Sequence, residues 1–127
     1  MSEVVFEMDN VSVIVMAGGI GERLQPLTEA RSKPAAPFFA GKFRFIDSTL
    51  SNCVNSCICQ ISVLTQYKST SLQGHIQEGW GISSSGFGDY IYCVPAQQKV
   101  GTDWYRGTAD ALCTHILQLV QQIIRLT

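Results

Sequence analysis

The chain has 127 residues, of which 46% are hydrophobic and 15% charged, and its net charge is -1. This composition predicts a soluble globular chain of about one domain, and the near-neutral charge disfavours a dedicated nucleic-acid binder. The N-terminus carries Glu3, Glu7 and Asp9 where a signal peptide would be basic and then apolar, and no apolar run approaches the roughly 20 residues of a membrane helix. We therefore expect a cytoplasmic protein.

Cysteine and histidine patterns give no signal for a metal site. The cysteines are Cys53, Cys57, Cys59, Cys93 and Cys113. Their number is odd and they form no C-x-x-C pair, so free thiols in a reducing compartment are favoured over metal binding. His75 has no further ligand at metal spacing, which favours a structural role, and His115 is expected on a helix surface or partly buried.

The elements alternate along the chain. Residues 11–17 are a β-branched apolar run, typical of a strand buried on both faces of a parallel sheet. Residues 46–58 have apolar side chains at helical spacing, a second apolar run follows at 60–66, and 69–80 is a second helical candidate. Residues 90–94 predict a third strand. This order indicates right-handed crossovers and a three-layer α/β fold with a mostly parallel sheet.

A long helix is predicted from Gly107 and Thr108 to the end of the chain. Thr108 is its expected N-cap, just as Asp47 is the expected cap of the helix at 46–58. One apolar stripe is expected along this helix, and it consists of Ala109, Leu112, Cys113, Ile116, Val120, Ile123 and Ile124. Because neither Gly nor Pro follows this helix before Thr127, an incomplete domain is expected.

Lysines and arginines are concentrated early in the chain. The segment from 18 to 44 holds five of the nine basic residues against two acidic ones, a local balance of +3. The basic residues are Arg23, Arg31, Lys33, Lys42 and Arg44. A solvated basic face is the ordinary explanation of such a cluster, but the glycines that open this segment favour a binding site.

Three glycines directly follow the first strand. Gly18, Gly19 and Gly21 permit left-handed backbone and a close approach of N–H groups to a ligand, and Arg23 adds a cation. Ligands of parallel α/β sheets bind beyond the carboxyl ends of the strands, so the loops after Ala17, Gln66 and Val94 should converge there. The glycine loop is therefore predicted to cradle phosphate oxygens.

Two familiar phosphate motifs are excluded. No window supplies the Walker pattern G-x-x-x-x-G-K-[ST]. The dinucleotide fingerprint also fails, because Leu24 stands in place of its last glycine and Gly41 stands near the place of its acidic residue. What remains is G-G-x-G-x-R-L, followed ten residues after Arg23 by Lys33.

These residues resemble the start of a sugar-1-phosphate nucleotidyltransferase, and more narrowly of the bacterial-type glucose-1-phosphate adenylyltransferases (ADP-glucose pyrophosphorylases). The stretches that carry the resemblance are "MAGGIGERLQPLT", "GKFRFIDSTLSNCVNS", "TQYKS", "HIQEGW", "PAQQ" and "WYRGTADA". The resemblance implies the Rossmann-like nucleotide-diphospho-sugar transferase fold. It also implies that ATP and glucose 1-phosphate react to give ADP-glucose and pyrophosphate with Mg²⁺, as in glycogen synthesis.

The resemblance assigns roles to residues of this chain. Ala17, Gly18, Gly19 and Gly21 would wrap the triphosphate, and Arg23 and Lys33 would neutralise it as the catalytic cations.

Adenine would be received by a second group of residues, namely Gln97, Gln98, Gly107 and Thr108. A glutamine amide offers a donor and an acceptor to the base, and which of the two glutamines makes the contact stays open.

The chain also departs from the family. Glu22 stands where threonine is usual, which puts a carboxylate beside the triphosphate loop, and Cys57 replaces a common glycine, which we interpret as repacking. The resemblance places the Mg²⁺ ligands, the sugar-binding residues and a C-terminal β-helix domain beyond residue 127. It thereby makes 1–10 an N-terminal extension and 11–127 the N-terminal nucleotide-binding part of the catalytic domain.

Three interpretations of function stay open. In the first, the chain is an inactive fragment of an adenylyltransferase whose full-length form is a homotetramer. In the second, it is a non-catalytic nucleotide-binding module or a degenerate paralogue, in which Glu22 is the first substitution that departs from the catalytic pattern. The third is a sugar nucleotidyltransferase that uses thymidine or uridine triphosphate.

Overall fold

A parallel sheet forms the centre of the computed structural model, which describes residues 11–81, 90–95 and 108–126. Its three strands are β1 (Ser12–Ala17), β4 (Gln60–Thr65) and β5 (Tyr90–Pro95), in the order β1-β4-β5. The central strand β4 is almost entirely buried, which explains the apolar residues Ile61, Val63 and Leu64 in its sequence.

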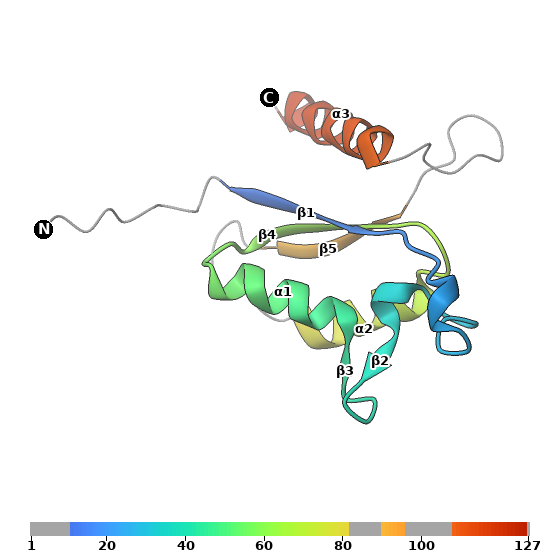
Figure 1. Ribbon diagram of the computed structural model, residues 1–127. Helices are drawn as coiled ribbons and strands as arrows, with labels where there is room; N and C mark the ends of the chain where they lie inside the picture. The colour runs from blue at the N-terminus through green and yellow to red at the C-terminus, as the bar shows by residue number, and fades with distance from the viewer. Residues whose placement is uncertain (1–10, 82–89, 96–107, 127) are drawn as a thin grey trace, which may run out of the picture.

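Helices lie on both faces of this sheet (Figure 1). The helices α1 (Phe45–Asn55) and α2 (Thr70–Trp80) lie on one face, and α3 (Thr108–Leu126) lies on the other. The main core forms between the sheet and α1 and α2, where burying each large apolar side chain stabilises the fold by about 1.5–3 kcal/mol. Its buried members are Ala17, Ala35, Ile46, Leu50, Ile61, Val63, Leu72 and Ile76. The predicted three-layer α/β architecture is confirmed.

The carboxyl ends of the three strands meet at one edge of the sheet. Ala17 pairs with Thr65, and Thr65 pairs in turn with Pro95. The loop after β1, the loop after β4 and the segment after β5 therefore all leave from this edge, as the parallel order predicts.

The start of α1 differs in detail from the expected cap. Arg44 is the N-cap residue and Asp47 is the third helical residue, whose Oδ2 accepts the backbone N–H of Arg44 at 2.8 Å. Asp47 thus caps the helix from inside its first turn, which is the carboxylate half of a capping box.

The end of α1 corrects the interpretation of Cys57. The helix ends at Asn55 rather than at Ile58, because Cys57 has φ 59 and lies in the left-handed region. The N–H groups of Cys57 and Ile58 donate to the carbonyls of Val54 and Cys53, both at 3.0 Å, which is the Schellman pattern of a helix terminus. The family's glycine is therefore replaced at a position where backbone conformation, rather than packing, favours glycine.

Within residues 108–117, the buried side chains of α3 are not those of its apolar stripe. Ala111 and His115 are buried at 1% and 2% exposure, whereas Ile116 of the stripe is 51% exposed and Cys113 is also exposed. His115 is therefore not a surface residue. Burial lowers its pKa, and among the residues that the structure describes neither ring nitrogen has a hydrogen-bond partner.

Four short elements between β1 and α1 have no counterpart among the predicted ones. They are the 3-10 turns η2 (Glu22–Leu24) and η3 (Lys33–Ala35) and the strands β2 (Pro37–Phe38) and β3 (Phe43–Arg44). The two strands form an antiparallel hairpin, and Phe38 of β2 stacks on Phe45, the first residue of α1, with ring centroids 5.6 Å apart. No helix in the described part of the chain is long and apolar enough to cross a membrane.

Candidate functional site

The glycine loop leaves β1 directly after the buried Ala17. Gly21 has φ 72, and a Cβ there would lie 2.8 Å from the Cβ of Lys33. A Cβ on Gly18 would lie 2.7 Å from Oε1 of Gln66, whereas one on Gly19 would meet nothing closer than 3.9 Å. Gly18 and Gly21 are therefore needed for close packing within the chain, and only Gly19 has free space beside it.

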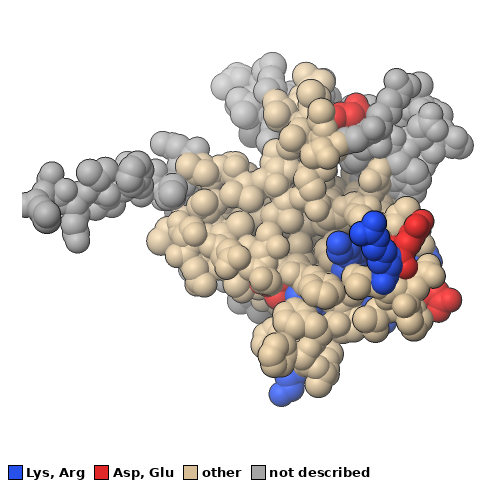
Figure 2. Space-filling view, in the orientation of Figure 1, with Lys and Arg blue, Asp and Glu red and all other residues tan. Residues whose placement is uncertain are grey.

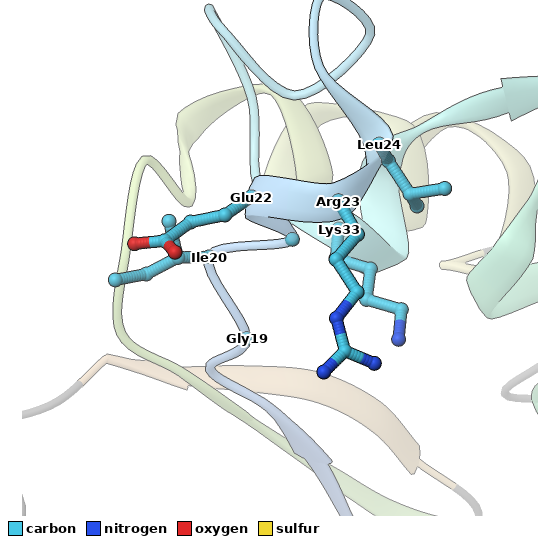
Figure 3. Close-up of a pocket in the computed structure, with 7 residues that line it drawn as sticks. Gly19, Ile20, Glu22, Arg23, Leu24 and Lys33 are labelled. Carbon is cyan, nitrogen blue, oxygen red and sulfur yellow. The ribbon is translucent and has the colours of Figure 1, made fainter.

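The loop and η2 border a hollow of about 620 Å³. Its lining consists of Gly19, Ile20, Gly21, Glu22, Arg23, Leu24 and Lys33. Figure 3 shows Arg23 and Lys33 side by side, projecting past the backbone at Gly19, while the carboxylate of Glu22 points to the other side of the turn. The structure thus brings together both predicted cations and two of the three glycines.

The hollow lies where basic side chains gather on the surface. In Figure 2, one group of Lys and Arg side chains lies over the segment that follows β1, with acidic side chains beside it, and a further basic side chain lies apart from it at the bottom of the view. Arg23, Lys33 and Glu22 are all exposed. Their charges are therefore accessible to a ligand, and salt will screen them.

Two hydrogen bonds attach the loop to the segment at 28–33. The hydroxyl of Thr28 donates to the carbonyl of Gly21 at 2.7 Å, and the N–H of Lys33 donates to the carbonyl of Gly19 at 3.1 Å. Thr28 itself is 2% exposed. Neither contact was predicted, since both end on a backbone carbonyl, and nothing in the sequence indicates which group will donate to such an oxygen.

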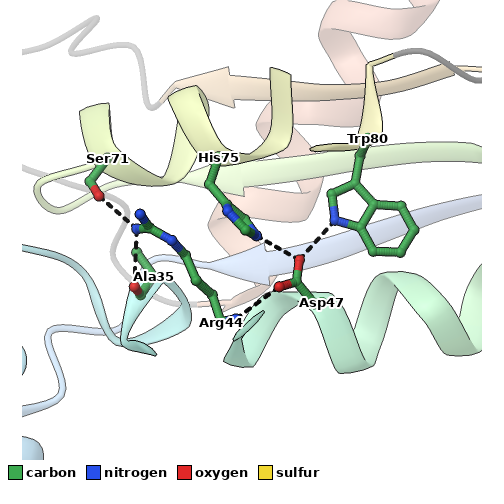
Figure 4. Close-up of polar contacts among 6 residues, drawn as sticks. All are labelled: Ala35, Arg44, Asp47, Ser71, His75 and Trp80. Atoms are coloured by element: carbon green, nitrogen blue, oxygen red, sulfur yellow. Dashed lines mark hydrogen bonds and ion pairs between the residues drawn. The ribbon is translucent and has the colours of Figure 1, made fainter. Parts of the chain in front are cut away.

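A polar network next to the site joins α1 to α2 (Figure 4). Oδ1 of Asp47 lies 2.7 Å from Nε2 of His75 and accepts the indole N–H of Trp80 at 2.8 Å. Burial raises the pKa of Asp47, but hydrogen bonds from the Arg44 backbone, Trp80 and His75 outweigh it and leave that pKa below its ordinary value. The structural role expected for His75 is thereby explained.

Arg44 extends this network to the turn that carries Lys33. Its Nη1 donates to the carbonyl of Ala35 in η3 at 3.2 Å and to Oγ of Ser71 in α2 at 2.7 Å. The basic residue Arg44 is thus part of the scaffold rather than of the hollow, and it fixes η3 against α2.

The residues expected to receive adenine are only partly described. Gln97, Gln98 and Gly107 lie outside the described residues, and Thr108 is the exposed first residue of α3. Pro95 ends β5 at the same sheet edge as Ala17, so the segment that contains the two glutamines starts from the edge where the glycine loop lies.

Metal ligands do not gather in the described ranges. No group of three or more His, Cys, Asp or Glu side chains could hold an ion there, and Glu22 is the one carboxylate in the lining of the hollow.

A glycine loop with two cations at the carboxyl edge of a parallel sheet defines an α/β protein with a candidate anion site. The chain matches the nucleotidyl transferase family over residues 12–124, and it belongs to that family.

Particular relatives are similar to most of this chain. It is 53% identical to glucose-1-phosphate adenylyltransferase 2 of Vibrio parahaemolyticus over 105 residues, and this aligned stretch covers 83% of this chain and 26% of that protein. It is 55% identical over 109 residues to the glucose-1-phosphate adenylyltransferase of Methylococcus capsulatus, covering 86% and 25% of the two chains. The enzyme of the same name from Dechloromonas aromatica is 57% identical over 104 residues, covering 81% and 23%. The chain therefore spans about a quarter of the length of these relatives, and the resemblance predicted from its motifs is confirmed.

Proposed function

We propose that this chain is the nucleotide-binding part of a glucose-1-phosphate adenylyltransferase and that its hollow receives the triphosphate of ATP. The observation that carries the proposal is the position of Arg23 and Lys33, which project together beside Gly19 at the carboxyl edge of the parallel sheet. The sugar phosphate and the adenine base of the proposal are inferred from the name of the similar proteins, glucose-1-phosphate adenylyltransferase.

In the proposed reaction, a phosphate oxygen of glucose 1-phosphate bonds to the α-phosphorus of ATP. The bond from that phosphorus to the oxygen shared with the β-phosphate breaks, and pyrophosphate leaves. Negative charge grows on the α-phosphoryl oxygens and on the leaving group, so positioned cations accelerate the step more than they strengthen ground-state binding. Arg23 would hold two phosphate oxygens in its fork, and Lys33 would supply a point charge.

Base selection belongs to the segment after β5 in this proposal. Gln97 or Gln98 would exchange hydrogen bonds with adenine, and Gly107 would let the base approach the backbone, with Thr108 at the start of α3 beside it. A glutamine amide offers a matched donor and acceptor to the edge of adenine, so ATP is expected to bind more tightly than UTP.

Mg²⁺ would enter the site as a complex with the nucleotide. Mg²⁺ is commonly held by one or two carboxylates together with substrate phosphates, and Glu22 alone among the lining residues is a carboxylate. Its side chain points away from Arg23 and Lys33. The described residues therefore do not fit a resident Mg²⁺ site, and we assign no step of the reaction to a metal held by them.

A non-catalytic nucleotide-binding module is the second candidate, and it is favoured by Glu22 in the lining of the hollow. A carboxylate beside phosphates weakens their binding by like-charge repulsion. The direction of the Glu22 side chain in Figure 3 favours the first candidate, because it separates this charge from the two cations.

The family resemblance adds three further parts to the proposal. Residues 11–127 would act as one nucleotide-binding unit after an extension at 1–10, the enzyme would assemble as a homotetramer, and it would work in the cytoplasm. Light scattering on the full-length enzyme measures its assembly, and a mass of one subunit at micromolar concentration would contradict the tetramer.

Calorimetric titration of the 127-residue chain with ATP and Mg²⁺ tests the site. Arg23→Ala and Lys33→Ala should each weaken binding about tenfold, the effect of one charge-assisted hydrogen bond that water partly replaces. Lys42→Ala is the matched control, since Lys42 is an exposed cation of the same early segment that does not line the hollow. Wild-type affinity in both test variants would mean that these cations do not bind nucleotide.

A further inference from the structure

The carbonyl of Gly21 is held by two donors. The Thr28 hydroxyl donates to it at 2.7 Å, and the N–H of Leu24 donates to it at 2.9 Å. Both lone pairs of this oxygen are therefore used within the chain. The hydroxyl is buried, so it has no competing partner in solvent.

The methyl group of Thr28 occupies the space that a side chain at Gly21 would enter. A Cβ on Gly21 would lie 3.0 Å from Cγ2 of Thr28, which is tighter than ordinary van der Waals contact. Gly21 has φ 72, a conformation that needs support from its surroundings. Thr28 therefore acts on Gly21 through both branches of its side chain.

These contacts determine where the N–H groups of the loop point. The peptide bonds after Gly19 and Gly21 are trans, so the N–H of Ile20 is directed opposite to the Gly19 carbonyl, and the N–H of Glu22 opposite to the Gly21 carbonyl. Both carbonyls are held by the segment at 28–33. The two N–H groups thus face away from that backbone, and within the described ranges they donate to no backbone acceptor.

We propose that Thr28 is a positioning residue that holds the glycine loop in its anion-binding conformation, a role that rests on the proposed binding of a nucleotide triphosphate. Without the hydroxyl, the peptide after Gly21 can rotate, since only the N–H of Leu24 then holds its carbonyl. The N–H of Glu22 would sample directions away from the ligand, and the loop would have to be ordered when the ligand binds.

Substitutions at Thr28 separate the hydroxyl from the methyl group. Thr28→Val keeps the shape and removes the donor, while Thr28→Ser keeps the donor and removes the methyl group. Thr114→Val is the matched control, because the Thr114 hydroxyl also donates to a backbone carbonyl, that of Asp110 at 2.9 Å, but in α3. Calorimetric titrations of the whole chain use two probes, ATP with Mg²⁺ and inorganic tripolyphosphate.

We expect Thr28→Val to weaken the binding of both probes about tenfold, the factor that one ordinary hydrogen bond supplies. Thr28→Ser should stay within about threefold of the wild type, because it retains that bond. Thr114→Val should bind like the wild type. Hydrogen exchange of the peptide that covers residues 17–24 should be faster in Thr28→Val than in Thr28→Ser, a difference that a general loss of stability would spread over the whole chain.

The outcomes distinguish the two proposals. Wild-type affinity in Thr28→Val, while the unmodified chain binds ATP, overturns the role of Thr28 and leaves the nucleotide site intact. Absence of binding of either probe to the unmodified chain overturns both. If Thr28→Val does not fold, Thr28→Cys replaces it, since Cys and Ser differ in one atom and the thiol is a weak donor. Equal affinities of the Cys and Ser variants would also refute the proposal.

Discussion

Replacing Cys57 by glycine is expected to stabilise the protein. Cys57 follows α1 with φ 59 and is exposed, so its side chain contributes little packing. A residue with a Cβ loses about 1–2 kcal/mol in this left-handed conformation. Glycine avoids that strain but loses about 0.5–1 kcal/mol more conformational freedom on folding. The difference predicts a gain of about 1 kcal/mol, which corresponds to about 2–5 °C in Tm for a domain of this size.

Urea denaturation and calorimetry measure this gain. Cys57→Ala is one control, because it removes the thiol and keeps the Cβ, and it should leave the free energy of unfolding almost unchanged. Cys113→Gly is the second control, since Cys113 is an exposed residue inside α3, and glycine there should destabilise by about 0.3 kcal/mol, the difference between the helix propensities of cysteine and glycine. A Cys57→Gly variant no more stable than Cys57→Ala would refute the assignment of Cys57 as a strained helix terminus.

Three further predictions follow from charged and titratable groups. The pKa of Asp47 is lowered in the folded chain, so its stabilising contribution is present above the unfolded pKa of about 3.9 and is lost as pH falls through the folded pKa. In denaturation curves, the free energy of unfolding of Asp47→Asn should therefore change less between pH 7 and pH 3 than that of the wild type. The pKa of buried His115 is also lowered, so stability should fall as pH drops below the unfolded pKa of about 6.5. His115→Leu should reduce that loss of stability between pH 7 and pH 5. A pH dependence of stability equal to that of the wild type would contradict the burial of a neutral ring. Glu22→Thr should leave the affinity for ATP unchanged or raise it in a calorimetric titration, because it removes an anion from the lining of the hollow, and weaker binding would indicate that Glu22 assists the ligand.

The strands and the helices that form the main core could be predicted because apolar residues form short runs in the strands and recur every three to four residues in the helices. The parallel order then determined which loops share an edge, and that edge carries Arg23 and Lys33. The face of α3 could not be predicted in the same way. An apolar stripe indicates which residues avoid water, but the side chains buried in residues 108–117 are Ala111 and His115, which lie outside the stripe.

The supports of the site were also beyond sequence reasoning. Thr28 acts on a backbone oxygen, and Arg44 acts on the carbonyl of Ala35, so neither contact requires a recognisable partner side chain. The hairpin of β2 and β3 was missed because its strands have two residues each, too few for an alternating pattern to appear. Cys57 was misinterpreted for a related reason, since a positive φ at a residue with a Cβ is a property of the backbone rather than of composition.

Titration of the ¹⁵N-labelled chain with ATP and Mg²⁺, followed by NMR, tests the central claim most directly. Residues 19–24 and Lys33 line the hollow, and Gly18 precedes them in the glycine loop, so the amide resonances of 18–24 and of Lys33 should shift together with a single affinity. The resonances of Lys42 and of the exposed residues of the β2–β3 hairpin should stay in place, because they lie outside the hollow. Shifts confined to other parts of the chain, with those of residues 18–24 unchanged at saturation, would contradict the claim that the glycine loop binds the nucleotide.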